Sequence, residues 1–305
     1  MLSVRFWGVR GSIPCPGQST VEFGGNTSCL EIRADKRLLI VDLGTGVKPL
    51  GDWYMQNDFR IGAVDMDIFI SHTHWDHIMG FPMFTPIFIP GAKLRIRGPG
   101  SYNEDTLASV IGDQLSYRYW PVRQSELSSK IEYQELRETT LDLGGGLIVR
   151  TKYMNHPILC LGYRFEYQGK SIVTAYDHEP FRNLFPTDPN APGYSEDAAV
   201  EGEKAAAEEN KRILDFFSCA DVLIHDAQYT QAEFEKHLGW GHSSYENAID
   251  AACQASVKKL VLFHHDPNSS DGQLQSLAEK YNSEVRGENA PEVIMAREGL
   301  TVEAG

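Results

Sequence analysis

Three histidines and one aspartate lie within six residues of this chain, in the segment His72-Thr73-His74-Trp75-Asp76-His77. A β-strand over residues 67–71 would direct the first two histidines to one side, because alternate side chains of a strand share a face. The turn after Trp75 would bring the aspartate and the third histidine towards the same point. Histidine nitrogen and aspartate oxygen are ligands of zinc and similar divalent ions. The spacing therefore predicts a metal site with donors enough for two ions.

Other candidate site residues follow apolar, β-branched segments at the points where these segments end. In chain order they are Asp42 after residues 38–41, His156 after 147–153, Asp177 after 171–176, His225 and Asp226 after 221–224, and His264 and His265 after 260–263. Strands that end along one edge of a sheet place their following loops together on a rigid scaffold. We therefore expect residues far apart in the sequence to converge on the histidine cluster.

The rest of the sequence predicts an α/β protein with one domain. With 305 residues and 42% hydrophobic content, the chain can bury a large core. Apolar residues recur three and four apart, which is the pattern of helices, over residues 103–115, 198–217, 245–255 and 273–281. We expect a single domain over residues 1–305, with an insertion near residues 183–207 that begins as a loop and becomes a helix with an acidic face.

Charge and cysteine content limit the classes of function and of partner. A formal net charge of -14 repels a long nucleic acid, whereas bound cations would attract a small anionic substrate, so we expect no extended nucleic-acid partner. The five cysteines are scattered singly, which argues against a disulfide framework and a cysteine zinc site. No signal peptide is recognisable and prolines interrupt the longest apolar stretch, so we expect a cytoplasmic protein without a membrane partner.

The histidine cluster, His156, Asp177 and His264 in this order resemble the metallo-β-lactamase superfamily across almost the whole chain. The fold that this resemblance implies is a four-layered αββα sandwich. With Asp76 and Asp177 in these positions, the chain looks like the phosphodiesterase branch, which includes ribonuclease Z and the class II cyclic-nucleotide phosphodiesterases. Four further motifs are similar to a bacterial group of cyclic-phosphodiesterase-like hydrolases: Gly11-Ser12-Ile13-Pro14, Gly24-Gly25-Asn26-Thr27-Ser28, His225-Asp226-Ala227-Gln228-Tyr229 and Gly241-His242-Ser243-Ser244.

The resemblance implies seven ligands and two divalent ions, of which zinc is favoured over manganese and iron. One ion would be held by His72, His74 and His156, a second by Asp76, His77 and His264, and Asp177 would bridge the two. Two such ions, about 3.5 to 4 Å apart, share a water or hydroxide, lower its pKa and stabilise both oxygens of a phosphoryl displacement.

The same resemblance implies three catalytic residues. Asp76 would orient the hydroxide and accept its proton. His242 would stabilise the charged transition state or protonate the leaving alkoxide, and Asp226 would hold it in the protonated form. The residues alone leave the choice between His264 and His265 open, and the resemblance favours His264.

Several other residues keep two interpretations. Ser12 and Asn26 can donate hydrogen bonds to a phosphate or cap tight turns, and His225 can contact a ligand carboxylate or simply end a strand. Asp42, before a Gly-Thr-Gly turn, is expected to anchor the histidine loop by hydrogen bonds.

By analogy with the fold, we also expect a homodimer. Aromatic residues after the cluster can line a cleft or pack in the core: Phe81, Phe84, Phe88, Tyr117, Tyr119 and Trp120.

Three functions are compatible with this site. We expect a hydrolase that cleaves a small phosphodiester, such as a cyclic nucleotide, by a metal-bound hydroxide. The alternative is a ribonuclease Z-like endonuclease that processes RNA. That family grips its substrate with a basic, glycine-rich arm, whereas the region between Asp177 and His225 is acidic and contains prolines. A non-catalytic metal-binding sensor module is the third, and the full set of ligands together with Asp226 and His242 disfavours it.

Overall fold

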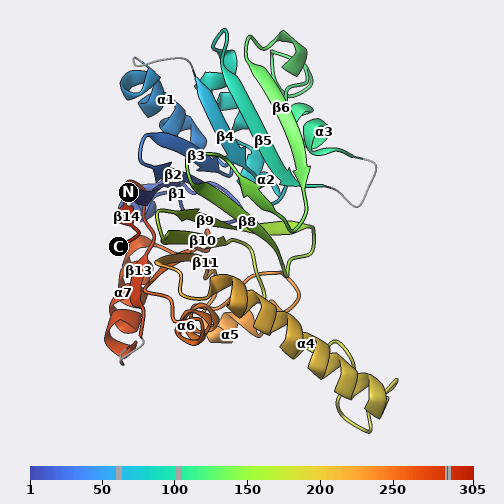
Figure 1. Cartoon of the computed structure of the whole chain (residues 1–305). Helices are drawn as coiled ribbons and strands as arrows, with labels where there is room; N and C mark the ends of the chain where they lie inside the picture. Colours follow the sequence, from blue (N-terminus) through green and yellow to red (C-terminus); the bar gives the residue numbers. More distant parts are fainter. Residues whose placement is uncertain (60–63, 101–104, 286, 288–289) are drawn as a thin grey trace.

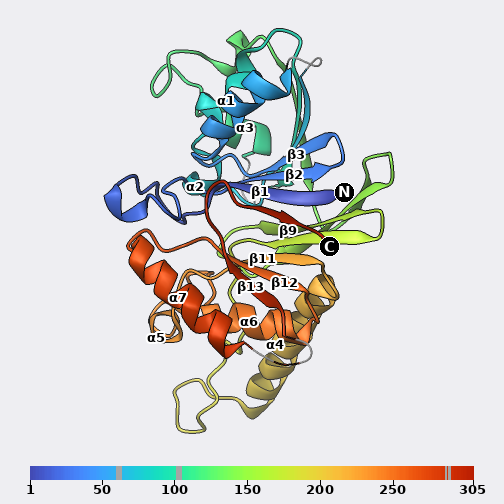
Figure 2. The same ribbon diagram turned by 90° about the vertical axis from the view of Figure 1, so that its left-hand side faces the viewer.

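The computed structural model describes residues 1–59, 64–100, 105–285, 287 and 290–305. In this part of the chain two seven-stranded β-sheets lie face to face, and helices cover the outer face of each sheet (Figure 1, Figure 2). These four layers confirm the αββα sandwich that the sequence predicts. The helix expected over residues 103–115 is shorter, because it begins after the capping residue Thr106 and ends at Gly112; residues 103–104 lie outside the described residues.

The first sheet has the strand order β14-β1-β2-β3-β4-β5-β6. Its strands are β1 (Leu2–Gly8), β2 (Cys29–Ala34), β3 (Arg37–Val41), β4 (Asp65–Phe69), β5 (Lys93–Pro99), β6 (Lys130–Leu136) and β14 (Thr301–Glu303). Strands β3 to β6 run parallel to one another. The carboxyl ends of β3 and β4 therefore lie at the same edge, where Asp42 and the histidine cluster follow them.

The second sheet has the strand order β13-β12-β11-β10-β9-β8-β7. Its strands are β7 (Thr140–Asp142), β8 (Leu147–Met154), β9 (Cys160–Tyr167), β10 (Lys170–Ala175), β11 (Val222–Asp226), β12 (Lys259–Phe263) and β13 (Glu292–Met295). Strands β10 to β13 are parallel, and β8 runs in the same direction because both β8 and β10 are antiparallel to β9. These five strands thus end at one edge, and the candidate residues follow four of them, β8, β10, β11 and β12, as expected from the sequence.

Helices cover both outer faces. α1 (Val47–Asn57) and α3 (Leu107–Gly112) pack on the first sheet, and α4 (Glu196–Phe217), α6 (Tyr245–Gln254) and α7 (Asp271–Glu284) pack on the second. None of the described helices is long and apolar enough to cross a membrane. The shorter elements are α2 (Trp75–Ile78), α5 (Gln231–Phe234) and the 3-10 helices η1 (Gln18–Thr20), η3 (Phe81–Met83), η4 (Thr85–Phe88) and η5 (Gln124–Glu126).

Much of α4 extends beyond the second sheet, so that the helix projects from the body of the protein (Figure 1). Of its 22 residues only Ile213 and Phe217, near its C-terminal end, are buried. The preceding loop and this helix occupy the region where the sequence predicts an insertion. The outward part of the helix is free to carry charged side chains because it contributes little to the core.

A central apolar layer fills the space between the two sheets. The ring of Phe69 on β4 meets the rings of Tyr163 and Phe165 on β9 edge-on, with centroids 5.2 and 5.6 Å apart. Truncating a buried aromatic side chain of this kind costs about 3–5 kcal/mol. These contacts therefore hold the two sheets, and the loops at their edges, in a fixed relation.

The aromatic residues that follow the histidine cluster are divided between the core and the surface. Phe81 and Phe84 are fully buried in the layer between α1 and the first sheet. Phe88, Tyr117 and Tyr119 are exposed to solvent. The structure thus supports the core interpretation for the first two residues.

Candidate metal centre

Four donor atoms from three separate parts of the chain form a first group. Nδ1 of His74 lies 3.0 Å from Nε2 of His72 and 3.0 Å from Nε2 of His156. Oδ2 of Asp177 completes the group, 3.4 Å from Nε2 of His72 and 3.9 Å from Nε2 of His156. Ligands of one tetrahedral zinc ion, with bonds about 2.1 Å long, lie roughly 3.4 Å apart. The four atoms are therefore spaced as the ligands of one ion are.

A second group of donors lies beside the first. The Nε2 atoms of His77 and His264 are 3.2 Å apart. Oδ2 of Asp76 is 3.2 Å from Nε2 of His77 and 3.1 Å from Nε2 of His264. Oδ1 of Asp177 faces the same two nitrogens, at 3.4 Å and 3.3 Å. The structure thus divides the seven predicted ligands into the two sets that the resemblance implies.

Asp177 presents one carboxylate oxygen to each group. Its side chain is 2% exposed, and among the described residues no group donates a hydrogen bond to Oδ1. Burying a carboxylate oxygen without a donor or a cation is costly. A cation on each side of Asp177 would compensate for this burial, so the residues present fit a pair of bound cations. Histidine and carboxylate donors without a thiolate suit zinc, manganese or iron.

Four of the five histidines in the two groups are oriented by partners on their outer nitrogens. Such partners fix the ring orientation and the tautomer of a metal-binding histidine. These partners are the hydroxyl of Ser71 for His72 (3.1 Å), the carbonyl of Gly241 for His156 (3.0 Å), the carboxylate of Asp42 for His77 (2.6 Å) and the side-chain carbonyl of Gln228 for His264 (3.1 Å). The inner nitrogens are thereby left pointing at the centre.

Asp42 anchors the histidine loop, as the sequence predicts. Its carboxylate accepts hydrogen bonds from the backbone N–H of Ser71 (2.7 Å) and from the hydroxyl of Ser71 (2.8 Å), besides the one from His77. The second sheet holds the same loop, because the hydroxyl of Tyr163 donates to the carbonyl of Ile70 (2.6 Å). The start of the loop is therefore fixed from both sheets.

Three residues at the site have a left-handed backbone conformation. Ser12, Asp42 and His264 each have a φ of 63°, which costs a non-glycine residue on the order of 1 kcal/mol or more. Each is held by hydrogen bonds to the site: the backbone N–H of Ser12, for example, donates to Oδ2 of Asp76 (2.8 Å). The local strain is compensated by the contacts that these conformations allow.

The structure brings His264, and not His265, to the centre. The ring of His265 is fully buried on the other side of the chain, where Nε2 donates to the carbonyl of Ala296 (2.8 Å). Gly11 lies so close to His264 that a Cβ atom there would be 2.4 Å from the imidazole ring. Glycine at this position therefore leaves the space that the ring of His264 occupies.

His242 and Asp226 form a pair at the edge of the two groups. Nδ1 of His242 donates to Oδ2 of Asp226 (2.9 Å) and lies 3.9 Å from Oδ2 of Asp177. Burial lowers the pKa of His242, but the carboxylates of Asp226 and Asp177 outweigh this effect and raise the pKa to about 9. By contrast, burial lowers the pKa of His156 to about 4. His156 is therefore neutral near pH 7, as a metal ligand must be.

Two residues with open interpretations are placed away from the centre. Asn26 donates from its backbone and its side chain to Glu298 (2.7 and 3.1 Å), so it stabilises a turn. Nδ1 of His225 donates to the carbonyl of Asp226 (2.7 Å), and the residue is buried at the end of β11. Both adopt the structural role that the sequence left open.

Sequence reasoning missed several residues that shape the centre. Ser71 stands directly before the cluster, yet a serine at a strand end carries no distinctive signal. Glu179 binds the backbone N–H of Gly241, and the carbonyl of Gly241 in turn accepts the hydrogen bond from His156. The Gly241-His242 motif and the position of Glu179, two residues after Asp177, are the only traces that the sequence offers.

Comparison with known proteins agrees with the fold. No family model matches the chain. It is 25% identical to ribonuclease Z from Thermoplasma volcanium over 97% of both chains, and 24% identical to ribonuclease Z from Synechococcus sp. strain CC9311 over 99% of this chain and 98% of that relative.

Three solved structures cover almost the whole chain. They are the metallo-β-lactamase fold protein YhfI from Bacillus subtilis (TM-score 0.63, 17% identity, 99% and 98% of the two chains), a diphosphatase of the PhnP family (0.61, 16%, 99% and 98%) and the short form of human tRNase Z (0.62, 19%, 99% of both). These likenesses show that the protein has the metallo-β-lactamase fold.

Proposed function

We propose that this protein, in which the metallo-β-lactamase fold carries two adjoining sets of histidine and aspartate donors, is a metal-dependent hydrolase of phosphodiesters. The observation that carries the proposal is the position of Asp177, whose two oxygens face separate donor sets. Two divalent ions, most readily zinc, would supply Lewis acidity and lower the pKa of a water molecule there. The residues that would hold them are His72, His74 and His156 for one, Asp76, His77 and His264 for the other, and Asp177 for both.

The residues of the chain divide the proton transfers between them. The N–H of Ser12 holds the carboxylate of Asp76, which can accept a proton from the attacking water. Asp226 holds the ring of His242 close to Asp177. His242 can then donate a hydrogen bond or a proton to the oxygen that leaves phosphorus.

A small phosphodiester, such as a cyclic nucleotide, is the substrate class that we favour. The projecting helix α4 carries seven acidic and three basic residues, and the whole chain has a net charge of -14. Such a surface repels a long RNA, because non-specific binding of nucleic acid depends on contacts between basic side chains and phosphates. A small anion meets only the mouth of the site, where bound cations would attract it.

RNA processing is the second candidate function. The relatives that cover 97–99% of this chain at 24–25% identity are ribonucleases Z, and the short form of human tRNase Z shares the fold. The same donor sets and the same His242 would serve this reaction. The acidic face of α4 is the feature that argues against it. The homodimer and the cytoplasmic location stay predictions.

Metal content and substrate choice together test the function. We expect about two zinc ions per chain and zinc-dependent cleavage of bis-p-nitrophenyl phosphate. A panel of cyclic mononucleotides, cyclic dinucleotides and a precursor transfer RNA then discriminates between the two candidates. Cleavage of the RNA alone would contradict the preference for a small substrate. A zinc-loaded protein that cleaves no phosphodiester at all would contradict the proposed function and leave the sensor module.

A further inference from the structure

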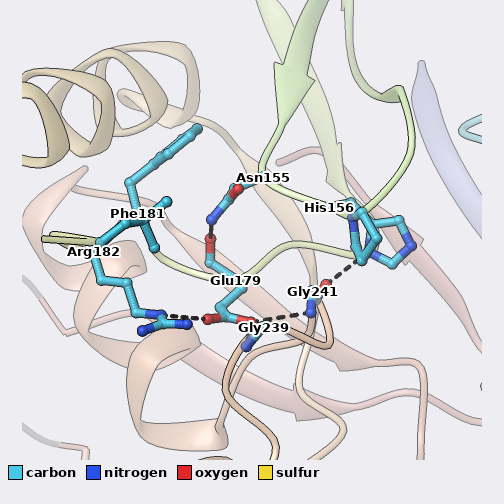
Figure 3. Close-up of a pocket in the computed structure, with 9 residues that line it drawn as sticks. Asn155, His156, Glu179, Phe181, Arg182, Gly239 and Gly241 are labelled. Atoms are coloured by element: carbon cyan, nitrogen blue, oxygen red, sulfur yellow. Dashed lines mark hydrogen bonds and ion pairs between the residues drawn. The ribbon is translucent and has the colours of Figure 1, made fainter. Parts of the chain in front are cut away.

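A buried carboxylate outside both donor sets connects the loop of His242 to the rest of the site. Glu179 lies two residues after Asp177, and its side chain is 4% exposed. Its Oε2 accepts hydrogen bonds from the backbone N–H groups of Gly239 (2.7 Å) and Gly241 (3.0 Å), as Figure 3 shows. Glu179 thus holds the turn that immediately precedes His242.

The backbone of Glu179 is bound to the segment that precedes His156. Its N–H donates to the carbonyl of Asn155 (3.0 Å), and its carbonyl accepts a hydrogen bond from the side chain of Asn155 (2.9 Å). Asn155 and His156 are consecutive at the end of β8. One residue is therefore tied to the loops that carry His156, Asp177 and His242.

Gly241 links Glu179 to the ring of His156 and so orients that ring. Its N–H is bound by Glu179, and its carbonyl accepts the hydrogen bond from Nδ1 of His156. Its φ of 83° is a left-handed conformation, and a Cβ atom there would lie 2.3 Å from Nδ1 of His156. Glycine is therefore needed for the turn to reach the ring, and Glu179 keeps the turn in place.

The charge of Glu179 is compensated without any metal. Besides the two N–H groups, Nε of Arg182 lies 3.4 Å from Oε1. The guanidinium is partly exposed beside a pocket of about 230 Å³, which Phe181 and Leu184 also line. Figure 3 shows that Arg182 and the two glycines approach the carboxylate from different directions. The buried carboxylate of Glu179 thus has a donor facing each of its two oxygens, which fixes it in place.

We propose that Glu179 is a positioning residue for both a metal ligand and the proton donor. Through the turn at residues 239–241 it aligns the Gly241 carbonyl with His156 and presents His242 to Asp226 and Asp177. This inference rests on the proposed function, in which His242 donates to the leaving oxygen. A displacement of the proton donor, here His242, by about 1 Å lowers the rate of reaction roughly 10- to 100-fold.

The leaving group gives a test that general destabilisation would not mimic. A series of methyl aryl phosphates, from p-nitrophenol to unsubstituted phenol, is hydrolysed with zinc in excess by the wild type and by Glu179→Ala. Nitrophenolate is weakly basic and leaves without being protonated. The more basic phenolate oxygen leaves readily only when a proton is donated to it. We expect kcat to fall about 10- to 100-fold for the phenol ester and less than about 3-fold for the nitrophenol ester.

Zinc affinity provides a second, independent measurement. Competition with a chromophoric chelator should show zinc bound about 10-fold more weakly by Glu179→Ala, because His156 loses an aligned acceptor. Glu179→Gln, which keeps one oxygen for both glycines, should recover most of both effects and replaces the alanine variant if that variant does not fold. Glu201→Ala, which removes an exposed carboxylate on α4, is the matched control, and we expect it to stay within about 3-fold of wild type.

An unchanged leaving-group dependence together with an unchanged zinc affinity, in a folded Glu179→Ala protein, would overturn the positioning role. If the wild type binds zinc but hydrolyses none of the esters, the proposed function fails instead. The chelator measurement then still decides the role of Glu179: weaker zinc binding supports it and equal binding overturns it.

Discussion

Nδ1 of His77 lies 2.6 Å from Oδ2 of Asp42, and both side chains are fully buried. The carboxylate also accepts both hydrogen bonds of Ser71. The backbone N–H of Ser71, its hydroxyl and the ring of His77 thus all donate to this carboxylate. An amide in its place would point its own N–H group at one of these donors. Within the described part of the chain, this pair is the closest contact between a histidine of the centre and a carboxylate outside it.

For Asp42→Asn we expect zinc affinity to fall about 10- to 100-fold, because His77 loses the partner that fixes its ring. The unpaired donor should also lower the free energy of unfolding by about 1–3 kcal/mol. Chelator competition and urea unfolding measure the two effects. Asp35→Asn, at an exposed carboxylate, is the control and should change neither. Zinc affinity equal to that of the wild type would show that Asp42 does not act on the centre.

Asp177→Asn tests the shared ligand. One oxygen of Asp177 faces each donor set, and an amide nitrogen cannot replace the second oxygen. We expect zinc content to drop by about one ion per chain and kcat to fall on the order of 10³-fold. Elemental analysis and hydrolysis of bis-p-nitrophenyl phosphate are the measurements. Asp221→Asn, another buried aspartate that is bound to Ser171 and Lys258, should keep both ions. Two ions retained in Asp177→Asn would contradict the bridging role.

His242→Ala separates the proton donor from the ligands. We expect kcat to fall about 10²- to 10³-fold while zinc content stays the same. Asp226→Asn should give a smaller loss, and the double variant should be no worse than His242→Ala, because the two residues act as a unit. Loss of zinc from His242→Ala would make His242 a ligand instead.

Asp67, which belongs to neither donor set, predicts a pH dependence of stability. Burial raises the pKa of this carboxyl, but hydrogen bonds from Arg95, Arg97 and Arg37 outweigh it and hold the pKa well below its usual range. A carboxyl with a lowered folded pKa stabilises the fold fully above its unfolded pKa, near 3.9, and this stabilisation is lost as the pH falls towards the folded pKa.

At pH 7 we expect Asp67→Asn to lower the free energy of unfolding by about 2–3 kcal/mol. This is less than the cost of breaking a fully buried ion pair, because the arginines are partly exposed to solvent. Between pH 5 and pH 3 the difference from wild type should narrow by about 1 kcal/mol. Urea unfolding at each pH provides the measurement. The more exposed Asp65 shares Arg95, and Asp65→Asn should cost less than about 1 kcal/mol. A difference that stays constant with pH would refute the assignment.

Much of the centre could be predicted because its donors are chemically distinctive and follow strands. The spacing of the cluster predicted donors enough for two ions, and the order of His156, Asp177 and His264 supported the resemblance that implied the two donor sets. The choice of His264 over His265 could not be made from the residues alone, since it depends on the left-handed turn after β12 and on the space beside Gly11.

The supporting contacts were harder to predict for a physical reason. The carboxylate of Glu179 accepts a hydrogen bond from the backbone N–H of Gly241, 62 residues further along the sequence, and nearly every residue can offer such an N–H. The short helix α3 likewise depends on one cap at Thr106. Such features are determined by tertiary geometry, which periodicity and residue type do not reveal.

The division of the donors between the two sheets has a consequence for the order of folding. His77 and His264 are 187 residues apart in the chain, and closing a loop of that length costs about 5 kcal/mol in entropy. The ions can find their complete set of donors only after the sheets have docked. Metal binding should therefore follow the docking of the sheets and then stabilise the interface between them. A chain in which only one sheet has formed lacks half of the donors, so metal cannot yet stabilise it in this way.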